Sequence, residues 1–220
     1  MKVLFLAKKG DDASSSALSY LHDKGFDVEH HFGEWGDKLP HSAAQWRGDI
    51  IISYLSRWIV PQALLDRANI AAINFHPAPP EYPGIGCNNF ALYNNEKTFG
   101  VTCHHMKAAV DTGEIIATKE FDLDASDNVE SILKRAYDAQ LALFQEVIDT
   151  FVKDGKFAVA NKQWARKPYT RKEFEELFII TPQMDADEVQ RRVRAVSFRQ
   201  YQPYIKLHGH TFKLVPNEAQ

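Results

Sequence analysis

The chain has 220 residues, of which 45% are hydrophobic and 25% charged, and 26 Lys and Arg against 29 Asp and Glu give a formal net charge of -3. This is ordinary globular composition, sufficient for one large domain or for one domain with a small appendage. The mild acidity argues against non-specific binding to nucleic acid or to an anionic membrane. No apolar run is long enough for a signal peptide or for a membrane span of roughly 20 residues. Cys87 and Cys103 are the only cysteines, which excludes a zinc ribbon or a disulfide framework and favours a cytoplasmic location.

Predicted strands and helices alternate in the first third of the chain. Strands are expected at 3–7, 26–32, 49–55 and 70–76, with one helix that ends at Gly25 and another that begins at Pro61. This alternation indicates an α/β fold with a doubly wound, Rossmann-like, mostly parallel sheet. The segment 77–86 then holds four prolines and two glycines, so we expect a shaped loop there.

The remaining elements differ in type. Two more strands are expected at 99–106 and 113–123, joined by a turn at 110–113. A long helix is expected from Asp127, which is followed by Glu130 in a capping-box pattern, to Gly155. Two short helices starting at Thr170 and Asp185 and a hairpin at 204–215 would complete the chain. We therefore place a main domain at 1–163 and a small C-terminal subdomain of helices and hairpin at 164–220, packed on it.

The motifs for several enzyme classes are absent from the sequence. It contains no Gly-x-Gly-x-x-Gly, Gly-Lys-Ser/Thr, His-Glu-x-x-His or Gly-x-Ser-x-Gly, which argues against nicotinamide enzymes, P-loop enzymes, zincins and serine hydrolases. Asn74 and His76 instead stand two apart at the end of a predicted strand, on one face and at the edge where α/β sheets bind ligands. An amide can stabilise an oxyanion while an imidazole moves a proton, which suits acyl transfer. Asp111, in a tight turn, is the best candidate to orient His76.

Three sequence blocks together resemble a known family. Asn-Phe-His with its loop at 74–84, Gly-Val-Thr-Cys-His-His-Met at 100–106 and Asp-Thr-Gly at 111–113 stand in the order found in folate-dependent formyltransferases. The wider resemblance covers roughly residues 49 to 150. It implies a formyltransferase domain at 1–163, 10-formyltetrahydrofolate as donor and an amine as acceptor, with no metal. The resemblance also implies catalytic roles for three residues: Asn74 as oxyanion donor, His76 as base and Asp111 as its orienting carboxylate.

The resemblance extends to the residues that would hold the donor. We expect seven residues to contact the folate: Ser56, Arg57, Trp58, Ile59, Val60, Thr112 and Gly113. His104 takes the place of the family's strand histidine, and we interpret it as a satisfied core histidine near the site. Five other histidines, His30, His31, His105, His208 and His210, show no metal-ligand spacing and are interpreted as structural or surface residues.

The branches of the family differ in the amine that accepts the formyl group. The loop form from His76 to Gly86 and the C-terminal segment look most like sugar N-formyltransferases, which act on a dTDP- or GDP-linked amino-deoxysugar in surface polysaccharide (O-antigen) biosynthesis. The glycinamide ribonucleotide enzyme uses a Gly-rich phosphate loop after the first strand, and the initiator-tRNA enzyme a larger C-terminal domain; neither is matched. Residues 189–215 carry six Lys and Arg and no acidic residue, a local charge of +6 suited to a diphosphate. We expect the acceptor at seven residues: Pro79, Tyr82, Gly84, Asn88, Arg194, Tyr201 and Tyr204.

Other functions stay open at this point. A hydrolase of 10-formyltetrahydrofolate and a non-catalytic folate- or nucleotide-binding module are the alternatives from other classes. The family resemblance implies a homodimer, while the cysteine usage and the charge lead us to expect a cytoplasmic protein with no nucleic-acid or membrane partner. The sequence does not specify the sugar or the amino position.

Overall fold

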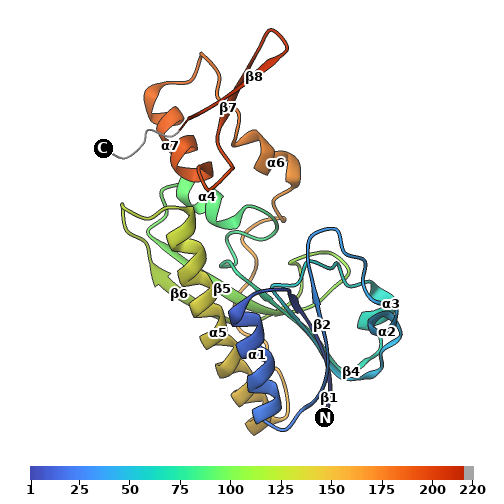
Figure 1. Cartoon of the computed structure of the whole chain (residues 1–220). Helices are drawn as coiled ribbons and strands as arrows, with labels where there is room; N and C mark the ends of the chain where they lie inside the picture. The colour runs from blue at the N-terminus through green and yellow to red at the C-terminus, as the bar shows by residue number, and fades with distance from the viewer. Residues whose placement is uncertain (216–220) are drawn as a thin grey trace.

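The computed structural model describes residues 1–215, which form a layered α/β body with a smaller C-terminal part (Figure 1). The central sheet has the order β2-β1-β3-β4-β5-β6. The first four strands in this order are parallel, and β5 and β6 each run antiparallel to the neighbour before them. The sheet strands are β1 (Lys2–Lys8), β2 (Asp27–Gly33), β3 (Gly48–Tyr54), β4 (Ala68–His76), β5 (Thr98–His105) and β6 (Ile115–Asp122). The mostly parallel α/β sheet expected from the alternation of elements is confirmed.

Helices cover both faces of this sheet. In chain order the helices are α1 (Asp12–Asp23), α2 (His41–Gln45), α3 (Gln62–Leu65), α4 (Cys87–Tyr93), α5 (Val129–Asp154), α6 (Arg171–Glu176) and α7 (Ala186–Val196), of which α6 and α7 belong to the C-terminal part. Side chains of β1 alternate between the two faces, so that Val3 and Phe5 join one core, with α1 and α5, while Leu4 and Leu6 join the other, with α2 and α3. The helices α1 and α5 lie side by side in Figure 1. Because both faces of β1 are covered, its residues are apolar on both sides and form an uninterrupted apolar run.

The long helix begins one residue later than predicted. Asn128 is its N-cap and accepts the backbone N–H groups of Glu130 and Ser131, while Ser131 closes the capping box. Asp127 instead accepts the Ser131 hydroxyl and pairs with Arg135. The predicted end is confirmed, because Gly155 has the left-handed φ of 71° that suits glycine at a helix C-terminus.

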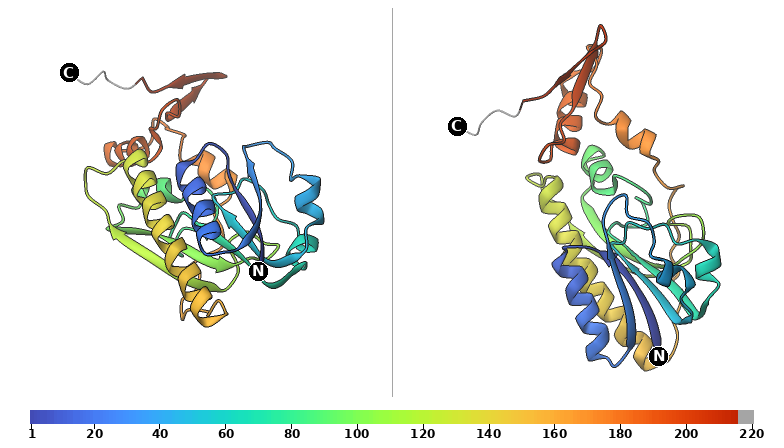
Figure 2. Two further views of the ribbon diagram at one scale, coloured as in Figure 1. Left: turned by 60° about the horizontal axis from the view of Figure 1, so that its bottom comes forward. Right: turned by 45° about the vertical axis from the view of Figure 1, so that its right-hand side comes forward.

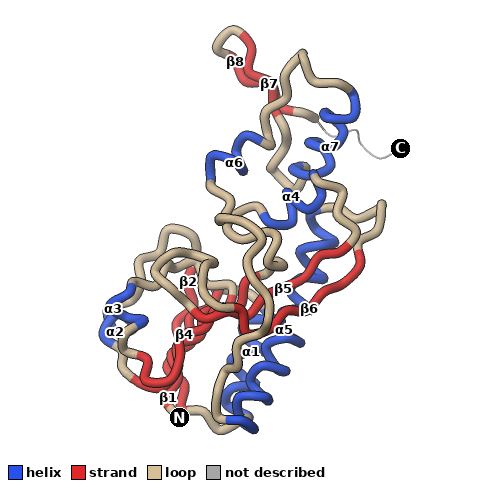
Figure 3. Tube along the Cα trace, turned by 180° about the vertical axis from the view of Figure 1, so that it is seen from behind, coloured by secondary structure: helices blue, strands red, loops and turns tan. Residues whose placement is uncertain are grey.

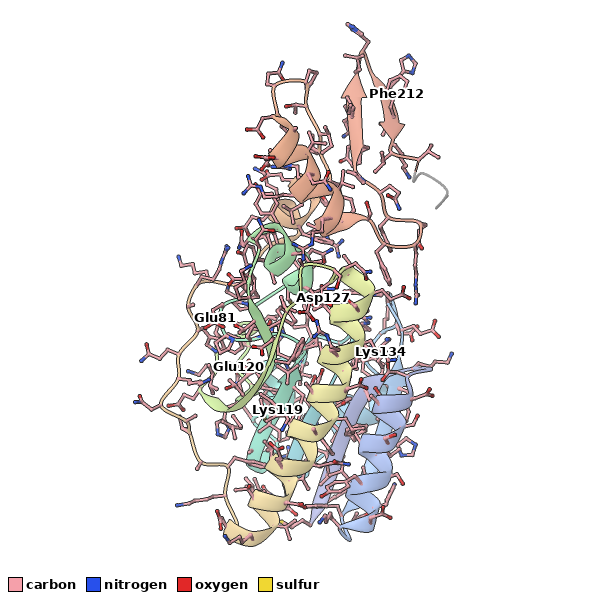
Figure 4. The ribbon with its side chains drawn as sticks, turned by 90° about the vertical axis from the view of Figure 1, so that its left-hand side faces the viewer. Glu81, Lys119, Glu120, Asp127, Lys134 and Phe212 are labelled. Carbon is pink, nitrogen blue, oxygen red and sulfur yellow. The ribbon has the colours of Figure 1, made fainter. Side chains whose placement is uncertain are left out.

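The C-terminal part packs on the main body through its helices. Ala195 and Val196 of α7 and Leu177 belong to the same buried core as α5. The hairpin of β7 (Tyr204–Leu207) and β8 (His210–Lys213) turns at His208 and Gly209, both with positive φ, as tight hairpin turns require. Both views in Figure 2 show this hairpin extending away from the sheet. In Figure 4, Phe212 lies on the hairpin, far from Asp127, which directly precedes the N-cap of α5. Phe212 is 57% exposed.

Over residues 1–215, no helix combines the length and the apolar character needed to cross a membrane.

Candidate active site

Strand β4 carries Asn74 and His76 to the edge of the sheet. The residues stand two apart and so point to the same face, and Pro77 ends the strand directly after His76. His76 is 5% exposed and Asn74 is half-buried, and both line one large cavity. The predicted pair therefore shares a wall of a ligand-sized space.

Asp111 reaches this pair from the turn between β5 and β6. Its backbone has a left-handed φ of 48°, a conformation that aspartate tolerates better than most residues. Its Oδ2 accepts the Gly84 backbone N–H at 2.8 Å and lies 3.4 Å from His76 Nδ1. The structure thus brings together Asn74, His76 and Asp111, which are separated by up to 37 positions in the chain.

His104 is a fourth member of this cluster, and its direct contacts were not anticipated. It lies opposite Asn74 in the β4–β5 pair and is 2% exposed. Its Nε2 is 3.3 Å from Asp111 Oδ1 and 3.1 Å from Asn74 Nδ2, and its Nδ1 donates to the His105 carbonyl at 2.7 Å. When Nε2 carries no proton it accepts an Asn74 N–H, and when it is protonated it donates to Asp111. His104 Nε2 therefore lies within hydrogen-bond distance of both the Asn74 amide and the Asp111 carboxylate.

His76 is held at both ring nitrogens. Its Nδ1 faces Asp111, its Nε2 lies 3.0 Å from the Tyr82 carbonyl, and the Cys87 thiol is 3.8 Å from the same Nε2. Only a doubly protonated ring donates to both oxygen acceptors at once. Burial raises the pKa of the Cys87 thiol, so this sulfur is a neutral neighbour and not a thiolate nucleophile.

Asp111 is the charged centre of the cluster. Burial alone would raise its pKa, but the charge of His76, the contact with His104 and the Gly84 N–H together outweigh burial and lower the pKa of Asp111 to about 2. Asp111 is therefore ionised at neutral pH. Its negative charge supports a protonated imidazole on either side.

This lowered pKa predicts an acid-dependent loss of stability. A carboxyl with pKa about 2 in the folded state and about 4 unfolded contributes about 2 kcal/mol above pH 4, lost as the pH falls to about 2. We expect the stability advantage of the parent chain over Asp111→Asn to shrink by that amount between pH 5 and pH 2. Urea unfolding of both proteins across this range measures it, and a constant difference would contradict it.

The cavity has a volume of about 680 Å³ and spans the cluster. Its lining near α3 comes from the β3–α3 loop, Trp35 and Met106 to Ala108. Its lining near α4 and α6 comes from Gly84 to Asn89 and from Pro168, Tyr169, Arg171 and Phe174. Seven of the predicted donor and acceptor residues line it: Ser56, Arg57, Trp58, Ile59, Val60, Gly84 and Asn88. Sequence analysis missed Trp35, Arg171 and Phe174, which line it from other elements.

Four predicted residues close to the cluster do not line the cavity. Tyr82 is buried, and its hydroxyl donates to Glu96 at 2.6 Å while its carbonyl contacts His76. Pro79 is in the same loop. Thr112 turns its hydroxyl to the Ala109 carbonyl, and Gly113 lies so close to β5 that a Cβ there would be 1.7 Å from the His105 carbonyl oxygen. These residues contact the segments that carry the cluster without lining the cavity themselves.

The C-terminal residues predicted for the acceptor lie outside the cavity as well. Arg194 donates to the Asp127 and Asp124 carbonyls and to Asn95, and it lines a second, smaller hollow. Arg192 pairs with Glu188 and also donates to the Glu176 carbonyl. Tyr201 lies just before the hairpin and Tyr204 is the first residue of β7. Three of the six cations, Arg191, Arg192 and Arg194, thus bind protein acceptors, and none of the six lines the cavity.

Among residues 1–215, no group of three or more His, Cys, Asp or Glu side chains is placed to hold a metal ion. The chemistry of the cluster is that of an amide, two imidazoles and a carboxylate.

An amide, an imidazole and a carboxylate that meet at the ligand-binding edge of an α/β sheet form a site suited to acyl transfer. The sequence matches the model of the formyl transferase family over residues 11–148. The chain belongs to this family.

Curated relatives include enzymes of different acceptor classes. A methionyl-tRNA formyltransferase from Citrifermentans bemidjiense is 27% identical over 164 residues, covering 73% of this chain and 51% of the relative. A GDP-perosamine N-formyltransferase from Brucella melitensis is 26% identical over 172 residues, covering 77% of this chain and 65% of the relative. The chain thus spans from about half to two thirds of the length of these relatives.

Solved structures match nearly the whole chain. A sugar N-formyltransferase from Shewanella superposes with a TM-score of 0.78 at 16% identity, covering 97% of this chain and 96% of the other. An N-formyltransferase from Helicobacter canadensis, in complex with folinic acid and dTDP-3-aminofucose, gives 0.71 at 18% identity, covering 95% and 85%. These similarities establish the shared fold.

Proposed function

We propose that the chain transfers the formyl group of 10-formyltetrahydrofolate to the amino group of a dTDP- or GDP-linked amino-deoxysugar, for surface polysaccharide assembly. The observation that carries this proposal is the meeting of Asn74, His76 and Asp111 in the wall of one cavity of about 680 Å³. Such a space accommodates a donor and an acceptor beside the cluster.

The part of the cavity near the β3–α3 loop suits a folate. Trp35 and Trp58 offer flat apolar surface there, and the Arg57 guanidinium lies 4.8 Å over the Trp35 ring. A pteridine and an aminobenzoyl group need aromatic faces, and the glutamate of a folate needs a cation. We assign Ser56 to Val60 to the donor for this reason.

The part of the cavity near α4 and α6 suits the acceptor. Arg171 lines it with its side chain 66% exposed and its closest carboxylate, Glu175, 3.9 Å away, so the guanidinium can bind a phosphate. Phe174 and Asn88 lie beside it on the cavity wall. In our proposal Arg171 supplies the positive charge that the sequence had assigned to Arg194.

The start of α1 argues against glycinamide ribonucleotide as acceptor. A phosphate could bind the free N–H groups of such a helix, but Asp11 already accepts the Ser14 N–H at 2.9 Å and Asp12 adds a second negative charge. A phosphate would be repelled there.

The chemistry follows from the cluster. As the acceptor nitrogen bonds to the formyl carbon it must lose a proton. Once substrate replaces the Tyr82 carbonyl as the partner of His76 Nε2, the ring needs only its Nδ1 proton, which points to Asp111, and in this singly protonated form it takes the acceptor's proton at Nε2. Asn74 donates to the formyl oxygen as negative charge develops on it. Asp111 supports the protonated His76, and the proton passes on to the folate nitrogen as its bond to the formyl carbon breaks.

One assay tests the proposal against its alternatives. The protein is mixed with 10-formyltetrahydrofolate and a panel of dTDP- and GDP-linked 3-amino and 4-amino sugars, with glycinamide ribonucleotide and methionyl-tRNA as comparators. Tetrahydrofolate release that requires an amino sugar, with a formylated product by mass, is the expected result. Release of tetrahydrofolate without any acceptor would indicate a hydrolase, and no release would indicate a binding module. Turnover with only one of the comparators would assign the enzyme to the class that acts on that comparator.

We infer further that the protein is a cytoplasmic homodimer. The free, buried thiols of Cys87 and Cys103 suit a reducing compartment. Exposed Leu207 and Phe212 on the projecting hairpin support self-association. Light scattering of the chain should give twice its mass.

A further inference from the structure

The connection between α5 and α6, residues 156–170, runs past β5 toward α4 and α6 (Figure 3). It is fixed to the rest of the site by backbone hydrogen bonds, from Ala160 to the Ile115 carbonyl at 2.8 Å and from Ala165 to the Pro80 carbonyl at 3.1 Å. Tyr169 then donates to the Pro83 carbonyl at 2.8 Å. The connection is therefore tied both to the segment after Asp111 and to the loop after His76.

Trp164 lies midway along this connection, against both histidines. Its ring centroid is 5.0 Å from that of His104 and 5.9 Å from that of His76, and it meets both rings edge to face, at 84° and 69°. It is not among the residues that line the cavity. Its ring thus supports the two imidazoles without access to a bound substrate.

The indole N–H of Trp164 also holds the turn that carries Asp111. It donates to the Gly113 carbonyl at 2.7 Å, two residues after Asp111. Gly113 is pressed against the His105 carbonyl on its other side, as the 1.7 Å approach of a Cβ there shows. The turn is therefore fixed between β5 and the indole, which leaves Asp111 little freedom to move away from His76.

A second contact of the connection fixes the partner of Asp111. Gly84, whose N–H binds Asp111 Oδ2, has φ 93° and lies against the Tyr169 backbone, where a Cβ would be 2.5 Å from the Tyr169 oxygen. Ile85 donates to that same oxygen at 3.3 Å. The connection consequently holds both the carboxylate turn and the loop that binds it, with Trp164 between them.

We propose that Trp164 is a positioning residue for formyl transfer: its ring sets the orientation of His76 and His104, and its N–H sets the position of Asp111. This rests on the role proposed above for the cluster. Trp164 acts through these side chains and touches no substrate, so its removal should lower kcat and leave both KM values nearly unchanged.

Two substitutions separate the parts of this role. Trp164→Phe keeps an aromatic ring and loses the N–H, and we expect kcat to fall about 5- to 10-fold, as for one lost hydrogen bond. Trp164→Ala loses both contacts, and we expect a fall of about 10²-fold, the scale of a misplaced catalytic group. Trp46→Phe is the matched control, because Trp46 is a buried tryptophan in the opposite core with no contact to the cluster and an N–H without a partner. It should leave kcat unchanged.

A double-mutant cycle distinguishes positioning from general stability. If Trp164 acts through Asp111, then Trp164→Ala should cost less than about 2-fold in an Asp111→Asn background. Thermal unfolding of each variant shows that the measured protein is folded. Fully additive losses, a rise in KM with constant kcat, or a normal kcat in Trp164→Ala would each overturn the inference. An inactive His76→Ala beside a normal Trp164→Ala would overturn this inference alone, whereas a fully active His76→Ala would overturn the proposed role of the cluster.

Discussion

Replacing His76 with alanine is expected to lower kcat by about 10²- to 10⁴-fold, the usual contribution of a general acid or base. The His76 imidazole faces Asp111 at Nδ1 and the Tyr82 carbonyl at Nε2, and this Nε2 opens on the cavity that His76 lines. Substrate must compete for that position, which places the reacting nitrogen next to Nε2. Steady-state release of tetrahydrofolate with an amino-sugar acceptor measures the loss.

The protein should stay folded after this change. Asp111 keeps its hydrogen bond from Gly84 and its contact with His104, so the carboxylate is not left without partners. His31→Ala is a matched control, since His31 pairs with Glu29 on β2 and does not line the cavity. If His76→Ala turned over within about tenfold of the parent chain, the assigned role would be wrong.

The sequence predicted those features that depend on local signals. The strand at β1 was visible because burial on both faces gives an uninterrupted apolar run, and the end of α5 because Gly155 must adopt a positive φ. The hairpin turn was visible for the same reason at Gly209. Asn74 and His76 were found because their two-residue spacing is itself structural information.

The helices α2 and α4 gave no comparable signal. Each is short, with five and seven residues, and neither has a side-chain N-cap. Buried residues run almost all round α4, which removes the helical periodicity that prediction needs. Their positions are decided by packing against the rest of the fold.

The roles of His104, Trp164 and Arg194 depend on contacts between distant segments. His104 meets Asn74 only through strand pairing, and Trp164 reaches the site from a position 53 residues beyond Asp111. Charge alone suggested a phosphate site at Arg194, but its guanidinium is used by the Asp124 and Asp127 carbonyls. A count of cations does not reveal which of them already have protein partners.

Replacing Asn74 with alanine is the second substitution for which we expect a large effect, a fall in kcat of about 10²- to 10³-fold. Its amide nitrogen lies 3.1 Å from His104 Nε2, and His104 is in turn fixed by its bond to the His105 carbonyl. The amide is therefore preorganised before substrate arrives, and preorganised donors stabilise a developing oxyanion without further rearrangement. Asn74→Asp should be at least as impaired, because it replaces the donor with a second negative charge near Asp111.

The kinetic pattern identifies the role of Asn74. A donor that acts mainly on the oxyanion should change kcat and kcat/KM together, whereas a group that binds the formyl oxygen equally in substrate and transition state should raise KM alone. Asn69→Ala supplies the comparison, because Asn69 is an exposed amide at the other end of the same strand, bonded to Asp49. A rise in KM with unchanged kcat in Asn74→Ala would assign this amide to substrate binding and leave the oxyanion to another donor.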